Sequence, residues 1–174
     1  MKLPKHSAYY ITGILLFIIL KLMYSNANNS QVFILLKPLD TIISFILDSH
    51  SVYNPDFGFY HETQNITIDK SCSGFNFLML SFVLIYFSVL KNLKSHFFKI
   101  IAIPLTLFFA FAFTQFVNAS RILTAIFIEK NTNFNYDWLH EAEGVFIYLS
   151  FLITLYISIN YVQNKIIHTH EKLT

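Results

Sequence analysis

Three polar residues lie inside or beside long apolar stretches, and their types suit acyl-transfer chemistry. Cys72 is the only cysteine in the chain, so it forms no internal disulfide, and it lies where a polar stretch meets an apolar one. Arg121 follows Asn118 by three residues with apolar sequence on both sides, and His140 lies just before the last apolar run. A thiolate can attack a carbonyl, a histidine can shuttle the proton, and a fixed cation can stabilise the oxyanion. Together these residue types predict cysteine-dependent acyl transfer.

Each of the three residues also has a simpler interpretation. Cys72 is suited to pack as a small apolar residue at the start of a helix. Arg121 can snorkel to a membrane surface and anchor its helix. His140 can be an interfacial histidine beside the Trp138 anchor. The catalytic hypothesis therefore depends on all three residues lying at one level on one side of a membrane.

The composition indicates an integral membrane protein. Hydrophobic residues make up 55% of the 174 residues and charged residues only 13%, whereas a soluble domain carries roughly 25% charged residues. Twenty Phe and ten Tyr are too many to bury in a water-soluble core of this size. A net charge of +2 without a basic stripe argues against nucleic acid as a partner and leaves the lipid bilayer as the main surroundings.

Four apolar runs are long enough, or nearly so, to cross a bilayer, which takes about 20 helical residues. They cover residues 8–24, 75–90, 100–117 and 145–162. No small-residue cleavage site follows the first run, so we expect it to be retained as a helix. A fifth stretch, 32–47, carries Lys37, Pro38 and Asp40 near its middle, and these favour an interfacial or re-entrant helix. We expect an all-α polytopic membrane protein: one domain over residues 1–174, with a bundle of about four transmembrane helices.

The charges of the loops predict the orientation of this bundle. The short loop 91–99 carries three lysines and no acid, and the head and tail of the chain are also basic, so all three should be cytoplasmic. The stretches 48–69 and 129–143 are mostly acidic and should lie outside. Four spans with both termini in the cytoplasm put every basic segment inside and every acidic loop outside. This arrangement places Cys72, Arg121 and His140 at the outer face.

A small hairpin should precede Cys72 on that face. Turn-forming residues cluster at 54–58. Gln64 and Asn65 can turn between 59–63 and 66–69, and the second of these pieces alternates apolar and polar residues as a half-buried strand does.

Helix geometry brings the second and third spans to a common level. Ser71 or Ser73 can cap the helix that follows Cys72, and Gly74 lets other backbone approach closely. A helix N-terminus favours negative charge and therefore the thiolate form of Cys72.

A helix rises about 1.5 Å per residue. About 18 residues after position 100, at Asn118, the third span therefore returns to the membrane depth of Cys72. Arg121 is one turn further on the same helix face. Glu141 or Glu143 can orient the imidazole of His140, although solvent exposure is their simpler interpretation.

At these residues the sequence resembles the exosortase/archaeosortase family. The matching motifs are Cys72-Ser73-Gly74, Asn118-x-x-Arg121 and the isolated His140, in the same order and spacing, and the resemblance covers about 59–161. The short length and the His-Glu-Ala-Glu-Gly segment look most like exosortase K.

The resemblance implies a cysteine endopeptidase/transpeptidase of the prokaryotic cytoplasmic membrane that uses no cofactor or metal. Its substrates would be membrane-anchored proteins with C-terminal sorting signals, each made of a short motif, a transmembrane helix and a basic tail. Cys72 would be the nucleophile, with Arg121 and His140 completing the site. The longer members carry extra N-terminal helices that this chain lacks, so the recognised motif and the acceptor nucleophile stay open.

Two other functions compete with this expectation. A non-enzymatic membrane subunit or chaperone would use the same polar residues only to anchor helices. An acyl- or lipid-transferase would share the Cys72 nucleophile but not the peptide substrate.

Overall fold

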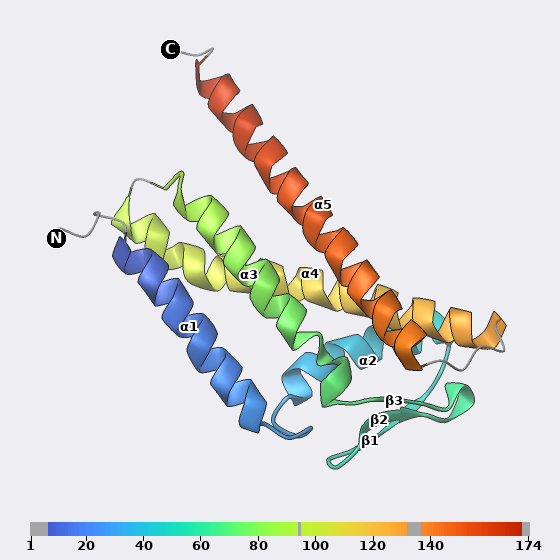
Figure 1. Cartoon of the computed structure of the whole chain (residues 1–174). Helices are drawn as coiled ribbons and strands as arrows, with labels where there is room; N and C mark the ends of the chain where they lie inside the picture. The colour runs from blue at the N-terminus through green and yellow to red at the C-terminus, as the bar shows by residue number, and fades with distance from the viewer. Residues whose placement is uncertain (1–6, 94, 132–136, 172–174) are drawn as a thin grey trace.

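A computed structural model describes residues 7–93, 95–131 and 137–171, with side chains described for 7–93, 95–130 and 142–165. Five helices and one small sheet make up these residues (Figure 1). The helices are α1 (Ser7–Asn26), α2 (Phe33–Leu47), α3 (Phe75–Leu90), α4 (His96–Asn131) and α5 (Asp137–Glu171). The strands are β1 (Ser51–Asn54), β2 (Gly58–His61) and β3 (Ile66–Ile68). A 3-10 turn, η1 (Glu62–Gln64), joins β2 to β3, and a second, η2 (Lys70–Ser73), lies between β3 and α3.

Within the described residues, four helical segments are long and apolar enough to cross a membrane. They are Ser7–Asn26, Lys70–Leu90, His96–Lys130 and Ala142–Lys165. This confirms the expected all-α polytopic membrane protein with about four transmembrane helices. Large apolar side chains point outward from these segments, among them Phe108, Phe146 and Leu149, as expected of surfaces that contact lipid chains.

Helix α3 is the central helix of the bundle. It contacts α1, α4 and α5, and more than half of its most apolar stretch is buried inside the protein. Its inner face carries Phe77, Phe82 and Tyr86, all almost fully buried. Because η2 leads directly into α3, the position of this central helix fixes the position of Cys72.

The third span continues well beyond the predicted limit of residue 117. Helix α4 continues through Asn118 and Arg121 to Asn131. The polar residues do not end the helix because Asn118 is fully buried and hydrogen-bonded within the protein. A prediction from hydropathy alone ends the span at such polar residues, because it does not take their hydrogen-bond partners into account.

Helix α2 has 15 residues and is not among the spanning helices of the described chain, in agreement with its exclusion from the predicted spans. Its inner face carries Leu36, Leu39 and Ile43, which are fully buried against the sheet and α4. Its outer face exposes Phe45 and Ile46.

The three strands form an antiparallel sheet in the order β1-β2-β3. The predicted hairpin is confirmed by β2 and β3, which are joined through η1 and Asn65 in the left-handed conformation, with φ of 53°. Strand β1 is an addition that the sequence analysis did not predict. The sheet lies at the end of the bundle opposite the α3–α4 connection (Figure 1).

A buried polar chain ties this sheet to α2. The His61 Nδ1 lies 2.8 Å from Ser49 Oγ, and its Nε2 lies 3.2 Å from Asp40 Oδ1. Lys37 Nζ donates to the other Asp40 oxygen at 2.9 Å. His61 and Asp40 are almost completely inaccessible to solvent, so these contacts hold the hairpin and α2 together from inside.

Candidate functional site

Cys72 lies in the 3-10 turn η2, immediately before α3. Asp69 caps this turn, since its Oδ1 accepts hydrogen bonds from the backbone N–H groups of Ser71 at 2.9 Å and Cys72 at 3.3 Å. The sequence predicted that Ser71 or Ser73 caps the helix after Cys72. Of these two, Ser73 Oγ accepts a 3.4 Å hydrogen bond from the backbone N–H of Phe75, the first residue of α3.

Gly74 separates the turn from the helix and has φ of 66°, a left-handed conformation that glycine adopts without strain. A Cβ here would lie 3.0 Å from Asn118 Nδ2 and 3.1 Å from Thr114 Cγ2. The expectation of a close approach is confirmed, but side chains of α4 approach rather than backbone. The glycine therefore lets α4 contact the residues beside Cys72.

Asn118 makes that contact. Its Nδ2 donates a hydrogen bond to the Cys72 carbonyl, and its Oδ1 accepts one from the Tyr148 hydroxyl at 2.8 Å. The side chain is completely buried. Asn118 thus connects the turn that carries Cys72 to α5 through α4, at the common level predicted from helix rise.

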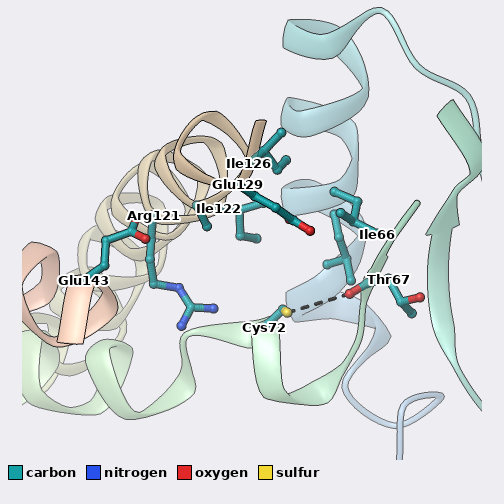
Figure 2. A pocket seen from close by; sticks show the side chains of 10 residues that line it. Ile66, Thr67, Cys72, Arg121, Ile122, Ile126, Glu129 and Glu143 are labelled. Carbon is teal, nitrogen blue, oxygen red and sulfur yellow. Dashed lines mark hydrogen bonds between the residues drawn. The ribbon is translucent and has the colours of Figure 1, made fainter. Parts of the chain in front are cut away.

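Arg121 lies one turn after Asn118 on α4 and is partly exposed. Its guanidinium carbon is 5.4 Å from the centre of the Tyr148 ring, within cation–π range. Gly144 of α5 lies beside the arginine stem, since a Cβ there would be 3.4 Å from Arg121 Cδ, an ordinary packing distance. Figure 2 shows the guanidinium turned toward Cys72, in the space between η2 and the two helices.

Cys72 and Arg121 line one cavity of about 220 Å³. One wall is β3 and the other is α4 (Figure 2). The lining combines apolar side chains with one cation and two carboxylates: Ile66, Thr67, Ile68, Cys72, Arg121, Ile122, Ala125, Ile126, Glu129 and Glu143. A partly enclosed space with a thiol and a guanidinium at its base is suited to acyl-transfer chemistry.

The Cys72 thiol contacts the strand beside it. Its Sγ lies 3.9 Å from the Thr67 carbonyl oxygen and 3.8 Å from Ser71 Oγ. The side chain is partly exposed, so the thiol is accessible from the cavity.

Two of the predicted residues, His140 and Glu141, have side chains outside the described residues. Their backbone belongs to the first turns of α5, and His140 precedes Glu143 by three residues. Glu143 is described and lines the cavity (Figure 2). The structure thus brings Cys72, Arg121 and Glu143 together. Among the residues with described positions, no group of three or more His, Cys, Asp or Glu is arranged to hold a metal ion.

A model of the transmembrane exosortase family matches residues 41–157, about two thirds of the chain. The chain belongs to the transmembrane exosortase family. The matched region begins inside α2 and includes the sheet, η2, α3, α4 and the N-terminal part of α5, and thus every residue of the cavity. No curated protein and no solved structure matches the chain.

Three residues of this candidate site were missed by the sequence analysis. Asp69 had a usable signal, since an Asp two residues before Ser71 is a common capping arrangement. Glu129 lies two turns after Arg121 on α4, a helical spacing that also suggested a shared face. Tyr148 had no signal, because it is one of many aromatic residues in an apolar run.

Proposed function

We propose that this exosortase-family chain is a membrane-embedded cysteine transpeptidase that cleaves C-terminal sorting signals of membrane-anchored proteins. The observation that supports this proposal best is the shared cavity of Cys72 and Arg121, which lies beside the edge strand β3 at one end of a helical bundle. A purely structural anchor would need no cavity between its arginine and the only cysteine of the chain.

The reaction proceeds through an acyl-enzyme. The Cys72 thiolate attacks the scissile carbonyl, and Arg121 stabilises the oxyanion that forms. His140 takes the thiol proton and passes it to the leaving amine, which departs with the transmembrane helix and basic tail of the signal. The remaining thioester is attacked by an outer-face acceptor, water or another nucleophile, and Cys72 is released as the thiol.

Two further residues support these groups. Asn118 holds the Cys72 carbonyl and so fixes the turn that carries the thiol. Glu143 lines the cavity three residues after His140 on α5, a helical spacing at which it could orient the imidazole.

The site faces the outside of the cytoplasmic membrane, with both termini in the cytoplasm. The lysine-bearing α3–α4 connection lies at the opposite end of the bundle from the sheet (Figure 1). A basic loop is retained on the cytoplasmic side, so the sheet and cavity are exposed outside. Within the family, the His-Glu-Ala-Glu-Gly segment at residues 140–144 favours the exosortase K type.

A Cys72→Ala chain tests the proposal in cells that normally produce the protein. Membrane proteins that keep their C-terminal helix and basic tail should accumulate, and mass spectrometry of their C-termini identifies them. Wild-type processing with a normal level of the variant would favour a non-enzymatic subunit. Loss of a lipid or acyl adduct, with unchanged C-termini, would favour a transferase.

A further inference from the structure

We propose that the sorting motif of the substrate binds as an extended strand on the free edge of β3, hydrogen-bonded to the backbone of Thr67. This binding mode rests on the proposed function and adds how the peptide is held. The proposed binding surface is the β3 wall of the cavity, which is lined by Ile66, Thr67 and Ile68 and carries no charged side chain.

Strand β3 is an edge strand. In the described sheet it pairs with β2 alone, through Phe59–Ile68, Tyr60–Thr67 and His61–Ile66. An edge strand presents N–H and C=O groups that can pair with another extended chain. Strand addition of this kind is a general way to bind a peptide with little dependence on its sequence.

The backbone of Thr67 points to the free edge. Its carbonyl oxygen accepts the weak hydrogen bond from Cys72 Sγ, on the side of β3 that faces α4 (Figure 2). In an antiparallel strand the N–H and C=O of one residue point to the same side. The Thr67 N–H is therefore directed into the cavity as well, which gives one donor and one acceptor for a peptide lying alongside.

The space beside this edge suits a peptide better than a lipid chain. The opposite wall is the apolar face of α4, formed by Ile122, Ala125 and Ile126. Arg121 and Glu129 nevertheless line the same cavity, and charged groups disfavour an acyl chain, which cannot hydrogen-bond to them. An extended peptide can pair its backbone with β3 and turn an apolar side chain toward α4.

This placement brings the scissile bond to the nucleophile. Since Cys72 Sγ is 3.9 Å from the Thr67 carbonyl, a strand paired with Thr67 passes next to the thiol. Pairing with β3 would fix the peptide in one extended conformation before the attack, which reduces the entropy lost on reaching the transition state.

The variants Thr67→Pro and Thr67→Val test the proposal in whole cells. Proline removes the backbone N–H, and an edge strand tolerates it where that N–H points away from the sheet. Valine keeps the N–H and changes only the exposed side chain. Processing of the precursor that accumulates with Cys72→Ala should be about five- to tenfold slower with Thr67→Pro than with Thr67→Val, the effect of one net hydrogen bond that only the valine variant keeps.

Disulfide trapping provides the second measurement. On a Cys72→Ser, Thr67→Cys background, single cysteines are moved through the motif of the same precursor. An added strand should crosslink at every second position, because alternate side chains share one face.

Crosslinks at every third or fourth position would overturn the proposal, and so would normal processing by Thr67→Pro. In either case loss of processing with Cys72→Ala would leave the proposed function standing. If Cys72→Ala instead processes normally, the proposed function fails and this binding mode fails with it. Labelling of Cys72 by a small thiol reagent in Thr67→Pro confirms that the site is folded.

Discussion

Two substitutions of Tyr148 separate the contacts of its hydroxyl from those of its ring, beside Cys72. Its hydroxyl donates to Asn118 Oδ1 at 2.8 Å, and its ring lies under the Arg121 guanidinium at 5.4 Å. The ring also stacks on Phe77, with centroids 4.9 Å apart. Tyr148→Phe removes only the hydroxyl, whereas Tyr148→Leu removes the hydroxyl and the aromatic face.

The expected magnitudes follow from burial. Asn118 is completely buried, so Tyr148→Phe leaves its Oδ1 without this donor. An unsatisfied buried acceptor costs about 1–3 kcal/mol. The Asn118 side chain reduces this cost by rotating, which weakens its bond to the Cys72 carbonyl. We expect processing to slow about 5- to 100-fold, since each 1.4 kcal/mol corresponds to a factor of about ten.

Tyr148→Leu should slow the reaction further. The cation–π contact is worth about 0.5–2 kcal/mol depending on how far it is desolvated. We therefore expect an additional loss of about 2- to 30-fold. On an Arg121→Gln background this additional loss should be smaller, because the leucine then removes only the stacking on Phe77.

The assay measures both processing of the precursor and the rate at which a small thiol reagent modifies Cys72 in isolated membranes. The matched control is Tyr156→Phe, on the same helix but 54% exposed. The control should behave as wild type in both measurements. Wild-type processing by Tyr148→Leu at a normal protein level would refute a positioning role for this residue.

Four further predictions concern orientation, charge, nucleophile and pH. Reporter fusions after residues 29, 94, 133 and 174 should read out, in, out and in; a cytoplasmic signal at 133 would remove the site from the outer face. Arg121→Lys should lose most processing while the protein still accumulates, because lysine lacks the planar guanidinium; near-normal processing would favour a membrane anchor. A small soluble thiol reagent should modify Cys72 from outside intact cells and block processing, and full modification without any loss would exclude the thiol as nucleophile. Burial lowers the pKa of His61, a shift that Asp40 partly opposes. The unfolded chain therefore binds the proton more readily, and thermal stability in detergent should fall as the pH drops below about 6.5. His61→Gln should flatten that dependence, and an unchanged slope would contradict it.

The spans were predictable because their length and apolar composition are local properties of the sequence. The end of the third span was not predictable, since the polar side chain of Asn118 is accommodated inside the bundle by hydrogen-bond partners in the turn η2, Cys72, and in α5, Tyr148. Strand β1 was missed for a similar reason: four residues without a strong alternating pattern become a strand through pairing with β2.

The candidate site was partly predictable. The rise of a helix gives the level at which Asn118 meets the turn before α3, and the Asn118–Cys72 hydrogen bond agrees with that level. Helix rise does not give the rotation of α5, which decides that Tyr148 rather than another aromatic residue lies under Arg121. The cavity wall formed by β3 also depends on tertiary packing of the hairpin.

The buried contacts among Ser49, His61 and Asp40 make the hairpin and α2 move as one body. Helix α2 exposes Phe45, at 87%, on the side away from these contacts, where lipid chains are its natural neighbours. An α2 that lies in the membrane interface, as its sequence predicts, would follow the bilayer surface and carry the hairpin that leads into Cys72 with it. Under the proposed function, a thinner or thicker bilayer would then raise or lower the thiol relative to a substrate anchored in the same membrane, and lipid composition would help to decide where that substrate is cut.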